Sequence, residues 1–404
     1  MILPCIRDLK CGPYLTQENT NLRGAILTDK MEVTPWAVSQ ELKDTDYDRI
    51  ADEFGAKRLN DEMLERIRGF TGDLHPFLKY GIFFAHRDLD LILDDYGKGK
   101  PFYLYTGRGP SGKMHLGHLL PFLFTRWLQD KFNADLIIQI TDDEKYLFRD
   151  IDQEDIAKYT DENILDILSL GFNPDRTHVL VDSQHSGLLY NNAIKVARYI
   201  TSSSAQAVFG FSDSDNIGKF FFTSIQAVPA FLLSELKGEN IRCLIPYAID
   251  QDPHFKLARD VIPKIGYYKP SSIISKFIPS LKGSGKMSSS DQNSGIYLDD
   301  DPKTVRRKLM KYAFSGGKDT AEEQRKYGAN PDIDFAFNVY RLLEENYGKV
   351  QKIHEEYRSG NMLSGEMKSL AADKINEFLA VLRTNKERVS KDVSSYMFDP
   401  ARFE

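Results

Sequence analysis

Short apolar runs alternate with longer amphipathic segments through the middle of this 404-residue chain. A short apolar run bounded by turn residues is typical of a strand that is buried on both faces of a sheet. Such runs predict strands over residues 102–106, 135–140, 179–182, 243–249 and 273–281. Apolar residues at helical spacing predict helices over 119–132 and 155–170. The alternation predicts an α/β fold: a Rossmann-like parallel sheet that begins at Phe102 and carries helices on both faces.

The two ends of the chain have a different pattern from the middle. Residues 1–33 are polar and without periodicity, which predicts a flexible terminus. Before the sheet, short helices are expected over 47–54 and 60–71, the second with Asn60 as its N-cap. After residue 299 the pattern turns helical, and a first helix is expected to start at Pro302. Four more helices are expected to follow it, over 334–346, 350–358, 366–385 and 387–397.

These changes of pattern divide the chain into regions. Residues 1–95 form an N-terminal extension, and residues 96–295 form the α/β domain. Residues 296–386 form an all-helical domain. Residues 387–404 are expected to form a terminal helix that packs back on the α/β domain.

Composition and charge narrow the possible functions. The net charge is −6, so contact with a nucleic acid would need a local basic face. Three cysteines form no Cys-x-x-Cys pair, which predicts neither a disulfide framework nor a zinc ribbon and suits a reducing cytosol. No apolar run approaches the roughly 18 residues that span a bilayer, and residues 1–10 are too polar for a signal peptide. We therefore expect a cytoplasmic protein without a membrane segment.

The stretch around which the rest is organised joins the first predicted strand to the first predicted helix. From Tyr105 to His118 it reads Tyr-Thr-Gly-Arg-Gly-Pro-Ser-Gly-Lys-Met-His-Leu-Gly-His. A strand, a glycine-rich turn and a helix form the entry unit of a nucleotide-binding sheet, because backbone N–H groups at the helix start attract phosphate. His115 and His118 are three residues apart and share one face of a first helical turn. Both imidazoles can donate to phosphate oxygens there.

A second interpretation of the same turn is weaker. Gly107, Gly109 and Gly112 also match the Gly-x-Gly-x-x-Gly fingerprint of dinucleotide-binding dehydrogenases. That fingerprint requires an acidic residue about 20 positions later, at the end of the next strand. The first candidate here is Asp142, which comes too late, and the fingerprint has no use for two histidines.

The segment resembles the first signature of the class I aminoacyl-tRNA synthetases. Their second signature, a Lys-Met-Ser-Lys-Ser-type loop, has a match in Lys-Met-Ser-Ser-Ser at residues 286–290. Further similarity lies in Tyr-Thr-Gly-Arg-Gly-Pro at 105–110, Gln-Ile-Thr-Asp-Asp-Glu-Lys-Tyr at 139–146 and Ala-Ile-Asp-Gln-Asp-Pro at 248–253. These segments resemble the tryptophanyl-tRNA synthetases of the eukaryotic cytoplasmic type, from about Thr34 to the C-terminus.

The resemblance implies an enzyme that activates L-tryptophan with ATP and transfers it to tRNA(Trp). Such catalysis consists of positioning the reactants and stabilising charge on phosphate oxygens. His115, His118 and Lys286 would donate to the ATP phosphates, and Arg108 would lie against the nucleotide. Mg²⁺ would accompany ATP to balance the pyrophosphate charge, and no protein-built metal site is predicted. The remaining residues of the implied ATP site are Gly107, Gly109, Gly117, Met287, Ser288 and Ser289.

The resemblance also implies the amino-acid pocket. The implied residues are Tyr105, Gln139, Glu144, Gln226 and Gln251. Their chemistry agrees with that role. An indole N–H only donates, so it needs an acceptor such as the Tyr105 hydroxyl or the Gln139 carbonyl. The substrate ammonium needs a carboxylate, which Glu144 can supply.

Two further regions acquire a role through the resemblance. The helical domain corresponds to the anticodon-binding domain, and an insertion in the α/β domain, around 150–240, corresponds to the interface of a homodimer. On the helix that starts at Pro302, the basic residues Lys303, Arg306, Arg307 and Lys308 are expected largely off the apolar face. Candidate tRNA contacts are Arg306 and Arg307 on that helix, which phosphates would attract, and Lys318 and Asp319 on the next turn, which would face exposed anticodon bases.

Three alternatives remain. A tyrosyl-tRNA synthetase shares the fold and would fit residues 110–118, although Ile-Thr-Asp-Asp-Glu-Lys at 140–145 argues against it. A nucleotidyltransferase that builds a cofactor from ATP can share His-x-Gly-His, but the helical C-terminal region and the pocket disfavour it. A non-catalytic RNA-binding relative would not need His115, His118 and Lys286 intact.

Overall fold

The computed structural model describes residues 55–277, 280–283, 287 and 293–403, together with 47, 49, 51 and 52. The predicted flexible terminus, residues 1–33, lies outside this part of the chain, and so does half of the helix predicted over 47–54. No helix within the described residues is long and apolar enough to cross a membrane.

The central sheet has seven strands in the order β1-β2-β7-β6-β3-β4-β5. The strands are β1 (Lys57–Arg58), β2 (Phe83–Arg87), β3 (Phe102–Arg108), β4 (Asp135–Ile140), β5 (Thr177–Val181), β6 (Arg242–Ala248) and β7 (Ser271–Ser275). The strands from β7 to β5 are parallel, which confirms the predicted Rossmann-like core. In chain order those five strands follow the 3-2-1-4-5 arrangement, so the order reverses between β3 and β6.

One edge of the sheet differs from the prediction. β2 pairs antiparallel with β7, and β1 pairs antiparallel with β2, so the expectation that the sheet begins at Phe102 is wrong. The apolar run Ile82-Phe83-Phe84-Ala85, which contains most of β2, was not predicted as a strand, and its antiparallel partner β7 lies far away in the sequence. β7 itself starts and ends earlier than the predicted strand over 273–281.

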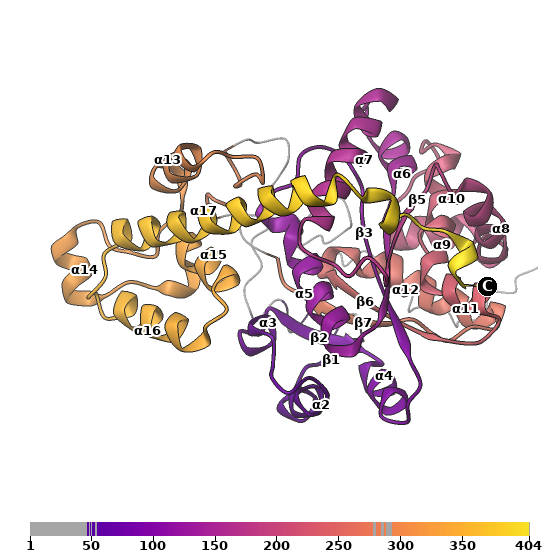
Figure 1. Ribbon diagram of the computed structural model, residues 1–404, viewed down its shortest axis with the longest axis horizontal. Coiled ribbons are helices and arrows are strands. Elements are labelled where there is room, and N and C mark those ends of the chain that lie inside the picture. Colours follow the sequence, from indigo (N-terminus) through magenta and orange to yellow (C-terminus); the bar gives the residue numbers. More distant parts are fainter. Residues whose placement is uncertain are drawn as a thin grey trace, which may run out of the picture.

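Helices surround the sheet and form a second region beside it (Figure 1). Around the sheet lie α2 (Asp61–Thr71), α3 (Pro76–Lys79), α4 (Leu89–Tyr96), α5 (Leu116–Phe132), α6 (Asp142–Phe148), α7 (Gln153–Leu168), α8 (Ser186–Ala197), α9 (Ser202–Phe209), α10 (Ile217–Ile225), α11 (Leu232–Lys237) and α12 (Asp252–Val261). The second region contains α13 (Pro302–Tyr312), α14 (Ala321–Tyr327), α15 (Phe335–Leu343), α16 (Tyr347–Arg358) and α17 (Ser364–Val389). The 3-10 turns are η1 (Val228–Ala230), η2 (Ile249–Gln251), η3 (Ile262–Ile265), η4 (Pro331–Ile333), η5 (Val393–Tyr396) and η6 (Pro400–Phe403).

Two helix starts follow from their capping residues. The Asn60 side chain accepts a hydrogen bond from the Met63 N–H at 3.0 Å, which confirms it as the N-cap of α2. Asp301 caps α13 by accepting from the Lys303 N–H at 2.8 Å, with Pro302 in the first turn. Such caps satisfy N–H groups that have no partner inside the helix.

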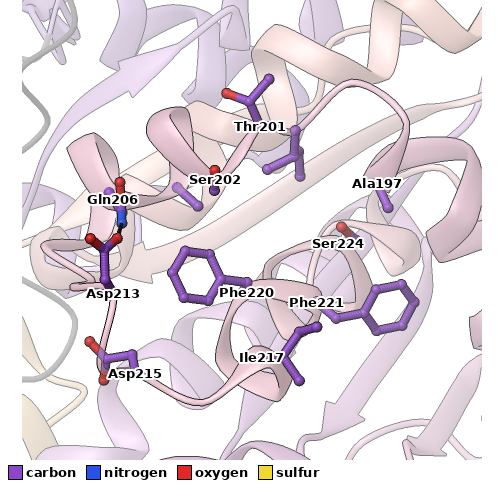
Figure 2. A pocket seen from close by; sticks show the side chains of 12 residues that line it. Ala197, Thr201, Ser202, Gln206, Asp213, Asp215, Ile217, Phe220, Phe221 and Ser224 are labelled. Carbon is purple, nitrogen blue, oxygen red and sulfur yellow. Dashed lines mark hydrogen bonds between the residues drawn. The ribbon is translucent and has the colours of Figure 1, made fainter. Parts of the chain in front are cut away.

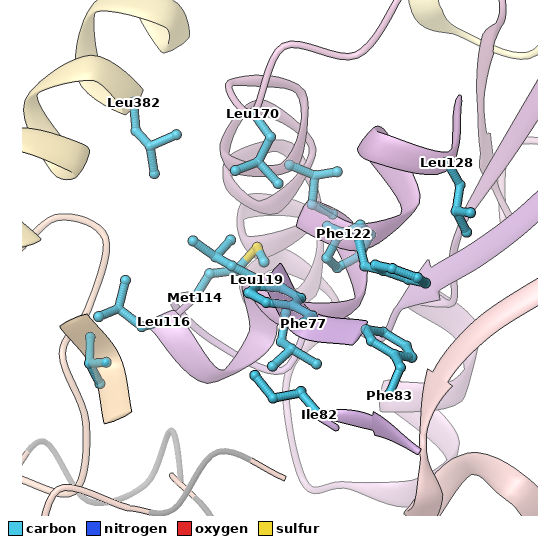
Figure 3. Close-up of a cluster of buried hydrophobic side chains, with 14 of the residues drawn as sticks. Phe77, Ile82, Phe83, Met114, Leu116, Leu119, Phe122, Leu128, Leu170 and Leu382 are labelled. Atoms are coloured by element: carbon cyan, nitrogen blue, oxygen red, sulfur yellow. The ribbon is translucent and has the colours of Figure 1, made fainter. Parts of the chain in front are cut away.

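The two faces of the sheet carry separate buried clusters, because alternate residues of a strand point to opposite faces. On β3, Phe102 and Leu104 join one cluster, which includes residues of α2, α5 and α7 (Figure 3). Tyr103 and Tyr105 join the other, which includes residues of α8 and α12. The first cluster continues without a break into α13, α15 and α17, so the helical region shares its core with the α/β region.

The C-terminal segment returns to the sheet, but not as the separate helix that was predicted from residue 387. α17 is continuous from Ser364 to Val389, so the predicted boundary between 386 and 387 falls within a helix. Beyond it, the Phe398 N–H donates to the Val179 carbonyl at 2.9 Å, beside the edge strand β5. Figure 1 shows this last stretch running from the helical region across to the sheet. The apolar period of α17 continues across residue 387. A local pattern therefore does not show where the chain stops packing on the helical region and starts packing on the sheet.

One basic residue of α13 also differs from the prediction. Lys308 is buried, and its ammonium donates to an Asp300 carboxylate oxygen at 2.7 Å and to the Gly295 carbonyl at 3.2 Å. It therefore anchors α13 to residues 295–300 and does not belong to a solvated basic face.

Candidate active site

The predicted site residues gather at the carboxyl ends of β3, β4 and β6. β3 ends in Arg108, β4 leads directly into α6, and β6 leads into η2. The strand order reverses between β3 and β6, and open α/β sheets bind their ligands at the carboxyl edge beside such a reversal. The topology therefore places the candidate site at a switch point.

The His-x-Gly-His segment begins α5. The His118 Nδ1 accepts a hydrogen bond from the His115 N–H at 3.2 Å. The two rings are stacked, with centroids 3.5 Å apart. Because the His118 Nδ1 accepts, a neutral ring carries its hydrogen on Nε2, where it is a donor. The first turn of α5 thus holds two imidazoles side by side, as the spacing predicted.

Met287 of the second motif lies against the first motif. The chain that follows the second motif runs beside the turn before α5: the Leu116 N–H donates to the Ile296 carbonyl at 3.0 Å, and the Leu298 N–H donates to the Met114 carbonyl at 3.1 Å. Met287 is buried, and its sulfur would lie 3.3 Å from a Cβ added to Gly117. Lys286, Ser288 and Ser289 lie outside the described residues.

A side chain at the glycines of the first motif would crowd neighbouring protein atoms. A Cβ on Gly109 would lie 2.0 Å from the Lys145 Cε, and one on Gly107 would lie 3.0 Å from the Gln139 carbonyl oxygen. A Cβ on Gly117 would lie 3.1 Å from the His115 ring. The close approach of a nucleotide to these glycines stays a prediction.

Arg108 lies between α7 and the α6 turn. Its Nε donates to the Asn163 Oδ1 at 3.1 Å. Burial lowers the pKa of Arg108 to about 10, and the nearby Glu144 carboxylate opposes that shift. Within the described residues its Nη2 is buried without a hydrogen-bond partner, so this cation retains a donor for a ligand oxygen.

The aromatic end of the predicted pocket is a buried network. The Tyr105 hydroxyl donates to the Gln139 Oε1 at 2.5 Å and accepts from the Gln226 Nε2 at 2.7 Å. The Tyr105 ring meets the Phe255 ring edge-on, with centroids 5.8 Å apart. Tyr105 and Gln139 are fully buried, whereas Gln226 is partly exposed. Burial raises the pKa of Tyr105 well above its usual value, so the hydroxyl keeps its proton.

Glu144 is the carboxylate at the other end. It accepts from the Thr141 hydroxyl at 2.9 Å and pairs with the Lys145 ammonium at 2.6 Å. Burial favours its neutral form, but the Lys145 ammonium outweighs burial and lowers the pKa of Glu144 below its usual value. The site therefore contains a buried carboxylate that already holds one ammonium group.

Gln251 stands apart from the other pocket residues. It is half-buried at the end of η2, and no hydrogen bond joins it to the other four in the described part of the chain. The fold does place it at the carboxyl end of β6, next to β3.

Several residues of the site were not predicted. The Gln139 Nε2 donates to both carboxylate oxygens of Asp182 at 2.9 Å. Lys145, Asn163 and Phe255 contact Glu144, Arg108 and Tyr105 respectively. Two of them carried a readable signal: Asp182 as an acidic residue at the end of a predicted strand, and Lys145 as a member of the 139–146 segment. Asn163 and Phe255 come from segments whose place beside the site depends on tertiary packing.

The candidate tRNA contacts lie in the helical region. Arg306 is exposed and pairs with Asp373 at 2.6 Å. Arg307, Lys318 and Asp319 are also exposed.

A hollow of about 450 Å³ opens in the insertion, where α8, α9 and α10 meet. Its lining includes Thr201 from the start of α9 and Phe220 and Phe221 from α10 (Figure 2). Ile217 at its rim is 87% exposed. None of the residues predicted for ATP or the amino acid lines this hollow.

Comparison with known proteins agrees with this geometry. Residues 97–380 match the family of tRNA synthetases class I (W and Y). The tryptophan–tRNA ligase of Saccharolobus solfataricus is 47% identical over 92% of this chain and 97% of its own length. The cytoplasmic tryptophan–tRNA ligase of Oryctolagus cuniculus is 44% identical over 96% of this chain and 85% of its own.

The crystal structure of Plasmodium falciparum tryptophanyl-tRNA synthetase superposes with a TM-score of 0.83 and 41% identity, covering 88% of this chain and 98% of that one. The family match and the aligned relatives span both the α/β core and the helical region of this chain. The chain therefore belongs to the class I tRNA synthetases (W and Y), and within them to the tryptophan–tRNA ligases.

Proposed function

We propose that this chain joins L-tryptophan to tRNA(Trp) in two steps. First, the tryptophan carboxylate attacks the α-phosphorus of ATP, which forms tryptophanyl-adenylate and releases pyrophosphate. Then a ribose hydroxyl of the terminal adenosine of the tRNA attacks the activated carbonyl and releases AMP. The observation that carries the proposal is the buried Tyr105–Gln139 pair beside the paired histidines at the switch point of the sheet.

Neither step needs a nucleophilic side chain, so catalysis rests on positioning and on donors to phosphate oxygens. His118 supports this role because its Nδ1 accepts from the His115 N–H, so a neutral ring carries its hydrogen on Nε2, where it is a donor. Its stacked neighbour His115 and the Arg108 Nη2 are further donors. Lys286 would add a cation from the second motif. Gly107, Gly109, Gly117, Met287, Ser288 and Ser289 would complete the ATP site.

Magnesium would enter with ATP. In the described part of the chain, no three or more His, Cys, Asp and Glu residues cluster so as to hold a metal ion. The phosphates of the nucleotide are therefore the ligands that we expect for Mg²⁺.

In the pocket, Tyr105 and Gln139 would accept the indole N–H. Each keeps acceptor capacity: the hydroxyl oxygen has two lone pairs and accepts one hydrogen bond from Gln226, and the Gln139 Oε1 accepts a short one from Tyr105. Glu144 would bind the substrate ammonium, since it already pairs with one from Lys145. Gln226 and Gln251 would complete the pocket. The names of the relatives favour tryptophan over tyrosine.

The pocket assignment is tested by the double variant Gln139→Ala, Tyr105→Phe. A buried N–H without an acceptor costs roughly 1–3 kcal/mol, so kcat/KM for tryptophan in ATP–pyrophosphate exchange should fall by at least that amount. Each residue can partly replace the other, so single variants should be milder. The double variant should also lose most of its preference for tryptophan over an analogue with sulfur in place of the indole nitrogen. Full retention of that preference would show that other groups read the N–H.

We propose the helical domain, 296–386, as the anticodon-binding domain beside the catalytic domain, 96–295, with the extension 1–95 before it. Arg306 and Arg307 of α13 would contact phosphates, and Lys318 and Asp319 would contact anticodon bases.

Replacing Arg306 and Arg307 by alanine should weaken tRNA binding and flatten its dependence on salt. Each lost phosphate contact reduces the slope of log K against log salt by about one. Filter binding at several salt concentrations measures this slope, and ATP–pyrophosphate exchange should be unchanged. Arg66→Ala is the control, since Arg66 forms a similar exposed ion pair with Asp94 in α4 (2.6 Å). An unchanged affinity and slope for the double variant would make α13 a solvated face.

We further propose a cytoplasmic homodimer that associates through the insertion, 150–240. Its helices α8 and α10 expose Tyr190, Ile194 and Ile217 around the hollow, and clustered exposed apolar side chains mark protein interfaces. The cytoplasmic relative supports the location.

A further inference from the structure

Gln139 lies in the middle of a buried hydrogen-bonded chain. Its Oε1 accepts from the Tyr105 hydroxyl at 2.5 Å, and its Nε2 donates to both oxygens of Asp182 at 2.9 Å. Tyr105 and Gln139 are fully buried, and Asp182 is 3% exposed. The carbonyl end of the Gln139 amide is therefore bound by a hydroxyl group, and its NH₂ end is bound by a carboxyl group.

The register of the strands builds this chain. Tyr105 on β3 pairs with Ile137 on β4, and Gln139 is two residues further along β4. Gln139 pairs with Leu180 on β5, and Asp182 is two residues beyond Leu180. Since strand side chains alternate with a period of two, all three groups point to one face of the sheet. That face also carries Phe255 against the Tyr105 ring.

Asp182 settles which end of the Gln139 amide faces the pocket. Both carboxyl oxygens of Asp182 lie 2.9 Å from the Gln139 Nε2 and accept from it. This contact selects the Nε2 end of the amide and turns the Oε1 away toward Tyr105. Burial, reinforced by the nearby Asp143, raises the pKa of Asp182 well above its usual value. The oxygens of a carboxyl group still accept from an amide N–H, so the contact keeps its direction.

We infer that Asp182 is a specificity-determining positioning residue: it fixes the Gln139 amide so that the pocket presents only acceptors to the ring heteroatom of the substrate. Asp182 itself does not touch the substrate. The inference rests on the proposed function, in which the Tyr105–Gln139 pair accepts the indole N–H. Asp182 would fix which end of the Gln139 amide is available for that contact.

A neutral amide at position 182 would remove this control. Asp182→Asn can present either its carbonyl or its NH₂ to Gln139, so the Gln139 amide can adopt both orientations. In the flipped orientation, Gln139 offers an N–H to the pocket. That favours a ring atom that accepts over the indole N–H, which donates.

The test is ATP–pyrophosphate exchange with tryptophan and with its benzofuran analogue, which has oxygen in place of the indole nitrogen. Asp182→Asn should lower kcat/KM for tryptophan roughly tenfold, the size expected for one misdirected buried hydrogen bond. For the analogue, kcat/KM should fall less than it does for tryptophan, or should rise. The ratio of kcat/KM for tryptophan to kcat/KM for the analogue should therefore shrink. KM for ATP should stay unchanged. Asp143→Asn should keep the wild-type ratio, because an amide there can donate to Asp182 and leave its acceptor side toward Gln139.

Asp166→Asn is the matched control for loss of a largely buried carboxylate, since Asp166 pairs with Lys386 of α17 and has no hydrogen bond to Tyr105, Gln139 or Asp182 among the described residues. It should keep the wild-type ratio. Thermal unfolding monitors the fold of each variant. Asp182→Ser, whose hydroxyl also both donates and accepts, is the second variant should Asp182→Asn not fold.

An equal loss for tryptophan and the analogue would make Asp182 merely structural and overturn the inference. Failure of both Asp182 variants to fold would overturn it as well, since the residue would then act on the fold. A wild-type enzyme without tryptophan-dependent exchange would instead contradict the proposed function itself.

Discussion

Arg87→Met is expected to lower the free energy of unfolding by about 3–5 kcal/mol, because it leaves a buried carboxylate without its cation. Arg87 on β2 and Asp252 at the start of α12 are both buried, and the Arg87 Nη2 lies 2.9 Å from the Asp252 Oδ2. The Tyr247 hydroxyl donates to the same carboxylate at 2.8 Å. Burial opposes the charge on Arg87, but Asp252 outweighs burial and raises the pKa of Arg87. This pair ties the antiparallel edge of the sheet to the residues next to Gln251.

Denaturant unfolding at a fixed protein concentration measures the change. Arg66→Met is the control: Arg66 pairs with Asp94 at 2.6 Å, but both side chains are well exposed, and such pairs contribute about 0–1 kcal/mol. Adding Asp252→Asn to Arg87→Met should recover part of the loss, since the uncompensated charge is then removed. Similar small losses for Arg87→Met and Arg66→Met would contradict this account of the edge.

Lys286→Ala is expected to slow adenylate formation roughly 10²–10³-fold, the usual effect of removing one donor to transition-state charge. The neighbouring Met287 lies against Gly117, and residues 296–298 pair with the first motif, so Met287 and the residues that follow the loop lie beside the first motif, and we expect Lys286 to reach the same site. A lysine that acts mainly in the transition state should affect kcat more than tryptophan binding.

Single-turnover kinetics with ATP, together with equilibrium binding of tryptophan, separates these two effects. Lys269→Ala is the control, an exposed lysine before β7. A wild-type exchange rate in Lys286→Ala would exclude the role proposed for this residue. Loss of tryptophan binding in parallel with kcat would indicate a ground-state role.

Most of the parallel core was predictable because its strands contain apolar runs, although β7, Ser-Ser-Ile-Ile-Ser, was predicted two residues late. β4 matches the predicted 135–140, and α5 begins only three residues before its predicted start. What the pattern missed depends on partners far away in the sequence. β2 is defined by pairing with β7, and the end of α17 changes partner without any change in its apolar period.

The site follows the same rule. The histidine pair follows from motif spacing, whereas Tyr105 and Gln139 were placed in one pocket by the family resemblance. Lys308 was assigned to a solvated face because helical spacing alone does not show that residues 295–300 cover it. Asp182 ended a predicted strand, but its contact with Gln139 becomes visible only when the register of β4 and β5 is known.

The central claim is that this site activates tryptophan with ATP. ATP–pyrophosphate exchange with each of the standard amino acids, one at a time, tests it most directly. The account predicts exchange that depends on tryptophan, with tyrosine far behind, because the pocket is expected to pair its acceptors with an indole N–H, which tyrosine lacks. Exchange that prefers tyrosine to tryptophan would contradict it, and so would the absence of exchange with every amino acid.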